Sequence, residues 1–124
     1  MCKEQTEQHA AILSHNIITC AHRRGDIKIY DQFTENLLCA QLISTIDAGE
    51  MQDTALSTDA LCKVYEATKN ASAEEIRDRY KSSLQGREGT IFEKAANNYL
   101  VADARTQSYI RSQLLTRLKR VIQA

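Results

Sequence analysis

The stretch that decides the fold is residues 90–124, which read TIFEKAANNYLVADARTQSYIRSQLLTRLKRVIQA. It begins with the signature of a capping box, because the Thr90 hydroxyl can accept a hydrogen bond from the Glu93 amide while the Glu93 carboxylate reaches back. No Pro or Gly follows, and the pattern predicts one long amphipathic helix. Apolar residues recur at the three- and four-residue spacing of one helix face: Phe92, Ala96, Tyr99, Leu100, Ala104, Ile110, Leu114, Leu118, Val121 and Ile122.

The predicted helix is longer than the bundle, so its end should be covered by another element. A straight helix would measure about 50 Å, whereas a compact chain of this size has a diameter of roughly 35 Å. A second copy, a different protein or a bend near residues 103–108 would resolve the mismatch. Asp103, Gln107 and Arg111 place polar side chains there, where the stripe should be apolar. In an antiparallel homodimer with its axis at Gln107, Asp103 of each copy would face Arg111 of the other.

The composition indicates a folded helical protein. Apolar residues make up 43% and charged residues 26%, and the formal net charge is zero, which excludes the disordered and membrane classes. Pro is absent and Gly numbers four, so few residues break helices. No apolar run approaches the ~20 residues of a membrane span, and the first residues lack a signal-peptide pattern. We expect a single domain over residues 1–124, located in the cytoplasm and without membrane association.

Four shorter helices are predicted before the long one, which makes an all-α bundle of about five helices. Gly25 and Gly86 are the expected stops, and Ser72 with Glu75 forms a second capping box. Residues 51–57 are expected to form a loop. The second helix has the broadest apolar arc and should be the most buried. In chain order, the four helices cover residues 4–24, 26–49, a short segment between a cap at 57–59 and a turn at 70–71, and 72–86.

Charge is distributed unevenly along the chain. Residues 26–59 contain seven acidic residues and one basic residue, whereas residues 104–124 contain five basic residues and no acid. We expect these two regions to attract each other, within one molecule or between two.

No motif for catalysis, metal binding or phosphate binding is present. His9, His15, Cys20 and His22 form the one cluster of metal-capable side chains, but no pair has the i, i+3 or i, i+4 spacing of a helical site. The four cysteines lack a CxxC pair, and Cys20 and Cys39 lie within apolar patterns, so buried reduced thiols are expected. The sequence thus predicts no enzyme, no cofactor and no metal.

The expected function is binding. We expect a small cytoplasmic regulator, adaptor, secretion chaperone or immunity-type inhibitor that presents its C-terminal helix to another protein or to a second copy. The apolar anchors of that helix could equally belong to the intramolecular core. The alternative function is nucleic-acid binding, with basic residues of the same helix contacting phosphates. The residues expected at a partner interface are Asp103, Gln107, Ile110, Arg111, Leu114, Arg117, Leu118 and Val121.

Overall fold

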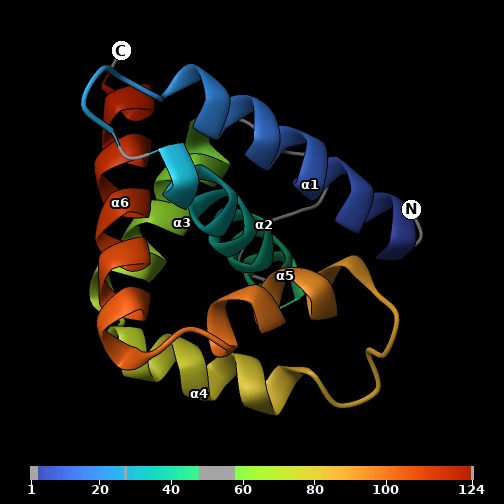
Figure 1. The fold of residues 1–124 in the computed structure, drawn as a ribbon. Coiled ribbons are helices and arrows are strands. Elements are labelled where there is room, and N and C mark those ends of the chain that lie inside the picture. Colours follow the sequence, from blue (N-terminus) through green and yellow to red (C-terminus); the bar gives the residue numbers. More distant parts are fainter. Residues whose placement is uncertain (1–2, 27, 48–57, 124) are drawn as a thin grey trace.

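The computed structural model describes residues 3–26, 28–47 and 58–123, and these residues form helices and turns without a strand. The predicted all-α bundle is confirmed, although the described residues contain six α-helices rather than about five (Figure 1). In chain order the elements are α1 (Lys3–Cys20), the short 3₁₀ helix η1 (Lys28–Tyr30), α2 (Asp31–Asp47), α3 (Thr58–Asn70), α4 (Ala73–Ser83), α5 (Ile91–Leu100) and α6 (Ala104–Ile122). The loop expected at residues 51–57 lies outside the described residues.

The segment predicted as one long helix is divided into two. α5 ends at Leu100 and α6 begins at Ala104, and the two helices meet at a corner (Figure 1). The cause is Asp103, which has extended backbone angles and accepts a hydrogen bond from the Thr106 amide at 2.8 Å. An N-cap of this kind starts a new helix and cannot lie inside a continuing one. The chain therefore bends at the predicted weak point, and no overhang exists.

α2 lies at the centre of the bundle, packed against α1, α3, α5 and α6 (Figure 1). Every residue from 37 to 45 is buried. Gln41 is one of three polar residues in this run, and it is only 2% exposed. It accepts a 2.6 Å hydrogen bond from the Tyr80 hydroxyl and donates one of 2.8 Å to Thr68. This satisfied network joins α2 to α3 and α4, and α2 is, as predicted, the most buried helix.

The connection between α1 and α2 differs from the prediction. α1 ends at Cys20 and α2 begins at Asp31, so both helices are shorter than expected. The second helix was expected to begin at residue 26, but the Asp26 carboxylate instead accepts from the Arg23 amide at 2.8 Å. Gly25 between them has a φ of 101°, which suits glycine alone. The resulting turn points the Asp26 carboxylate towards α6.

The capping box predicted for α4 is confirmed, whereas only half of the one predicted for α5 forms. Ser72 and Glu75 form the full capping box at the start of α4. Thr90 accepts from the Glu93 amide at 3.1 Å, as predicted. The Glu93 carboxylate, however, accepts from the Gly89 amide at 3.1 Å rather than from Thr90. The Thr90 amide already donates to a carbonyl of the preceding turn, which leaves Gly89 as the available donor.

Candidate functional site

The apolar anchors predicted for partner binding lie in the core of the chain itself. Ile110, Leu114 and Leu118 have no exposed surface, and Val121 is partly buried against the same core. α6 packs along α2 and α3, because the corner at Asp103 turns the apolar stripe back onto the bundle. The structure therefore assigns these residues to the intramolecular alternative, and none of the three fully buried anchors is available at the surface.

The polar residues of the predicted interface also have partners within the chain. Asp103 caps α6, and the hydrogen bond from the Thr106 amide lowers the pKa of its carboxyl. Gln107 is buried and donates to the Tyr99 carbonyl at 3.1 Å. Arg111 donates to three carbonyl oxygens at the end of α3. The distances from its guanidinium nitrogens to these oxygens are 2.8 to 3.2 Å, and the carbonyls belong to Thr68, Lys69 and Ala71. Asp103 and Arg111 therefore have other roles than facing each other across a two-fold axis.

Arg117, the remaining charged residue of the predicted interface, is a buried cation. Its side chain has no exposed surface. Its Nη2 atom lies 2.6 Å from a carboxylate oxygen of Asp31, and its Nε atom lies 3.9 Å from one of Asp26. Within the described chain no guanidinium nitrogen forms a hydrogen bond of good geometry. The contacts are therefore ionic, and they offset the cost of burying the cation.

Arg120 pairs with Asp26, one of the two acids beside Arg117. Its Nη1 atom lies 2.7 Å from Asp26 Oδ2, and the same nitrogen donates to the Ala21 carbonyl at 2.9 Å. The Arg120 hydrogen bond is the largest of the causes that lower the pKa of Asp26 to about 2. Asp31 in turn lies 3.1 Å from Nδ1 of His22. The predicted attraction between the acidic and basic regions thus acts, at these residues, within one chain.

A surface hollow of about 550 Å³ lies beside these ion pairs. Arg23 contributes from the turn after α1, and the remaining residues come from the end of α6. Three of the five lining residues are cationic, and none of them is acidic. Arg23 and Lys119 are exposed, while Asp26 fixes the guanidinium of Arg120. We call this surface the basic corner; its lining residues are Arg23, Thr116, Lys119, Arg120 and Gln123.

Sequence reasoning identified only part of the basic corner. Lys119 and Arg120 belong to the basic residues of the C-terminal helix, which were predicted to contact phosphates under the alternative function. Arg23 was missed, because a cation at the end of a helix is explained by the helix dipole alone. The nearest signal was the run of Arg23 and Arg24 directly before Gly25. The sequence does not show that Arg23 lies near the end of α6, because this proximity depends on how α1 packs against the bundle.

The thiols and imidazoles do not gather into a site among the described residues. Cys39 is buried as predicted, and burial raises the pKa of its thiol to about 12. Cys20 is exposed, contrary to the prediction, because it lies on the outward side of the last turn of α1. His15 lies 2.8 Å from Glu35. Across the described ranges, no group of three or more His, Cys, Asp or Glu side chains is placed to hold a metal ion.

Comparison with known proteins adds no assignment. No protein-family model matches the chain, and neither a curated protein nor a solved structure matches it significantly. Of the described helices, none combines the length and apolar character needed to cross a membrane.

Proposed function

We propose that the chain is a non-catalytic binding module that recognises an acidic segment of another protein through the basic corner. The observation that carries this proposal is the hollow between the turn after α1 and the end of α6, which is lined by three cations and no acid. The apolar part of the expected interface is buried, so the basic part of α6 is what remains for a partner.

The basic corner is organised before a partner arrives. Arg120 is held by Asp26 and by the Ala21 carbonyl, so little side-chain freedom is lost when it meets a carboxylate. Lys119 and Arg23 are exposed and line the same hollow. An Asp or Glu side chain entering the hollow would meet cations from two segments that are far apart in the sequence. Such complementarity favours specificity and a fast association rate.

The test uses a fluorescent poly-glutamate peptide, with anisotropy measured at low and moderate salt. We expect the unmodified chain to bind it, and the double variant Arg23→Glu/Lys119→Glu to lose binding about tenfold or more. Lys81→Glu is the matched control, because Lys81 is exposed on α4 and does not line the hollow. Equal binding by the double variant and the control would contradict the proposal.

Nucleic-acid binding is the competing outcome of the same assay. Arg105 is exposed at the start of α6, and exposed Ser108, Ser112 and Thr116 continue the same face towards Lys119. A duplex could follow this whole face, whereas an acidic side chain needs only the basic corner. Tighter binding of duplex than of peptide, a steep loss of affinity with salt and sensitivity to Arg105→Glu would support the nucleic-acid function instead.

A further inference from the structure

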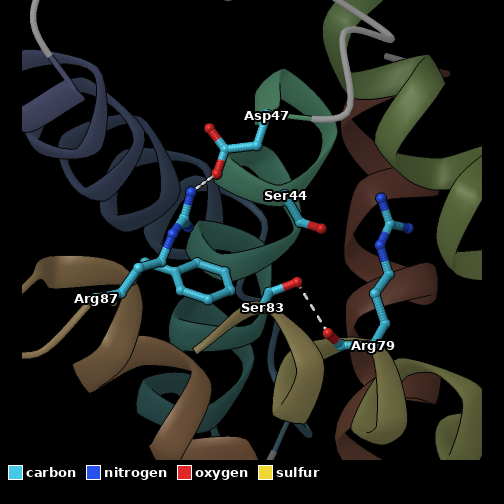
Figure 2. A pocket seen from close by; sticks show the side chains of 6 residues that line it. Ser44, Asp47, Arg79, Ser83 and Arg87 are labelled. Carbon is cyan, nitrogen blue, oxygen red and sulfur yellow. Dashed lines mark hydrogen bonds and ion pairs between the residues drawn. The ribbon is translucent and has the colours of Figure 1, made fainter. Parts of the chain in front are cut away.

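A second hollow lies near the far end of α2, away from the basic corner. It has a volume of about 290 Å³ and lies where α2, α4 and α5 meet. α2 has 17 residues and spans about 25 Å, which separates the two surfaces. We call this hollow the arginine pocket. Its wall consists of Ser44, Asp47, Arg79, Ser83, Arg87 and Phe92 (Figure 2).

Arg87 is fixed on one side of the arginine pocket. Its guanidinium carbon lies 4.5 Å from the ring centroid of Phe92, which is fully buried. Its Nη2 atom forms an ion pair with Asp47 (Figure 2). Its Nη1 atom is buried and has no hydrogen-bond partner in the described chain. A buried donor without an acceptor is costly, and native structures rarely leave one unpaired. Arg87 is therefore rigidly placed with one donor unused.

Arg79 stands on the opposite side of the arginine pocket (Figure 2). Unlike Arg87, it forms no ion pair with another described residue. The hydroxyls of Ser44 and Ser83 lie between the two guanidinium groups. The Ser83 hydroxyl already donates to the Arg79 carbonyl at 2.9 Å, whereas Ser44 is only 6% exposed and its hydroxyl is the remaining donor. The pocket thus offers cations on two walls and a hydroxyl-lined middle.

The charge and size of the arginine pocket define the ligand class. Among the described lining residues, two arginines and one aspartate leave a net charge of +1, because Asp47 pairs with Arg87 and no described acid pairs with Arg79. Guanidinium groups match the planar pairs of oxygens that a phosphate group presents, and they bind it through two hydrogen bonds each. The volume lies at the small end of the range for ligand sites. A phosphate with a few additional atoms satisfies both conditions, and a large ligand does not.

We propose that the arginine pocket binds the phosphate group of a small molecule, either inorganic phosphate or a small phosphate monoester. Arg79 supplies a positive charge that no other described residue pairs, Arg87 supplies a second guanidinium group on the opposite wall, and the Ser44 hydroxyl supplies a further donor. Asp47 orients Arg87, but its own negative charge repels the ligand. This binding site is separate from the basic corner and does not depend on it.

The test is isothermal titration with inorganic phosphate and with glycerol phosphate, at an ionic strength held constant with chloride. We expect binding with a Kd below about 10 mM. Arg79→Gln should weaken binding of both probes about tenfold or more, because a charge-assisted contact is lost. Arg79 has no ion pair among the described residues, so the variant should keep its fold, which circular dichroism checks. Tighter binding of the monoester would identify an esterified ligand, and equal affinity would identify free phosphate.

The matched control is Arg77→Gln, which makes the same change on the same helix. Arg77 pairs with Glu74 and Asp78 at the surface and does not line the arginine pocket. The proposal is overturned if the unmodified chain binds neither probe, if Arg79→Gln binds as well as the unmodified chain, or if Arg77→Gln weakens binding equally.

Discussion

At the scale of single residues, the structure reassigns charged side chains from partner contacts to internal ones. Arg117 was predicted at an interface because it lies at the edge of an apolar stripe. It lies instead fully buried between Asp26 and Asp31. Periodicity cannot distinguish these two places, because both require one polar residue beside apolar neighbours. The distinction depends on acids about 90 residues earlier in the chain, whose positions only the fold determines.

The pairing of Arg117 leads to a prediction about which partner is costly to remove. Asp31→Asn leaves a buried cation with only the 3.9 Å contact to Asp26, so we expect a loss of about 3 kcal/mol in the free energy of unfolding. Arg117→Met keeps an apolar side chain of similar length, and Asp26 and Asp31 retain Arg120 and His22. We expect that change to cost less than about 1.5 kcal/mol. Urea denaturation measures both values.

The double variant Asp31→Asn/Arg117→Met is the control for this pair. It should be more stable than Asp31→Asn alone, because the uncompensated cation is gone. A loss for Arg117→Met as large as that for Asp31→Asn would show that the guanidinium stabilises the fold through something other than its two carboxylates.

At the scale of elements, the sequence predicted which segments are helical better than where they end. The apolar spacing correctly selected buried residues in both α5 and α6, since Phe92 and Leu118 are both fully buried. It did not predict that the stripe turns a corner. The signal was Asp103, an N-cap residue type in the polar part of the pattern. No Pro or Gly accompanies it, so the local sequence alone is also compatible with a continuous helix.

The corner between α5 and α6 makes a charge swap informative. In the structure, Asp103 caps α6 and Arg111 binds three carbonyls at the end of α3. We therefore expect Asp103→Arg and Arg111→Asp each to lower the melting temperature. Their combination should lower it further by about the sum, because the two side chains do not pair. Thermal melts followed by circular dichroism measure the three variants.

The homodimer hypothesis has the opposite expectation for the same variants. It requires Asp103→Arg to weaken self-association and the added Arg111→Asp to restore it. Light scattering on the same samples measures the mass of each variant and so distinguishes the homodimer hypothesis from the intramolecular roles. Recovery of both mass and melting temperature in the double variant would contradict the intramolecular roles described for these side chains.

At the scale of the whole molecule, the charge pattern was the most informative part of the sequence. It predicted that residues 26–59 and 104–124 attract each other. The ion pairs that Arg117 and Arg120 form with Asp26 and Asp31 are examples of this attraction. The all-α class followed from composition and spacing in the same way. The arginine pocket was not predicted, because Asp47, Arg79 and Arg87 belong to three separate segments and form no motif along the chain.

Folding the C-terminal stripe inward changes the expectation for self-association. Homodimerisation was predicted because a single long helix would extend beyond the bundle. The corner at Asp103 shortens this helix, so its length no longer requires a second copy. Among the described residues, the large apolar side chains left exposed are Ile12, Ile29 and Val101, which lie on three separate elements or turns. Scattered apolar residues are normal on a monomer surface. We therefore expect light scattering behind size exclusion to give the mass of one chain, 14.0 kDa, at both low and high salt. A dimer that resists high salt would contradict this and indicate an apolar interface formed outside α6, with Ile12 on the outer face of α1 as the first position to replace by a charged residue.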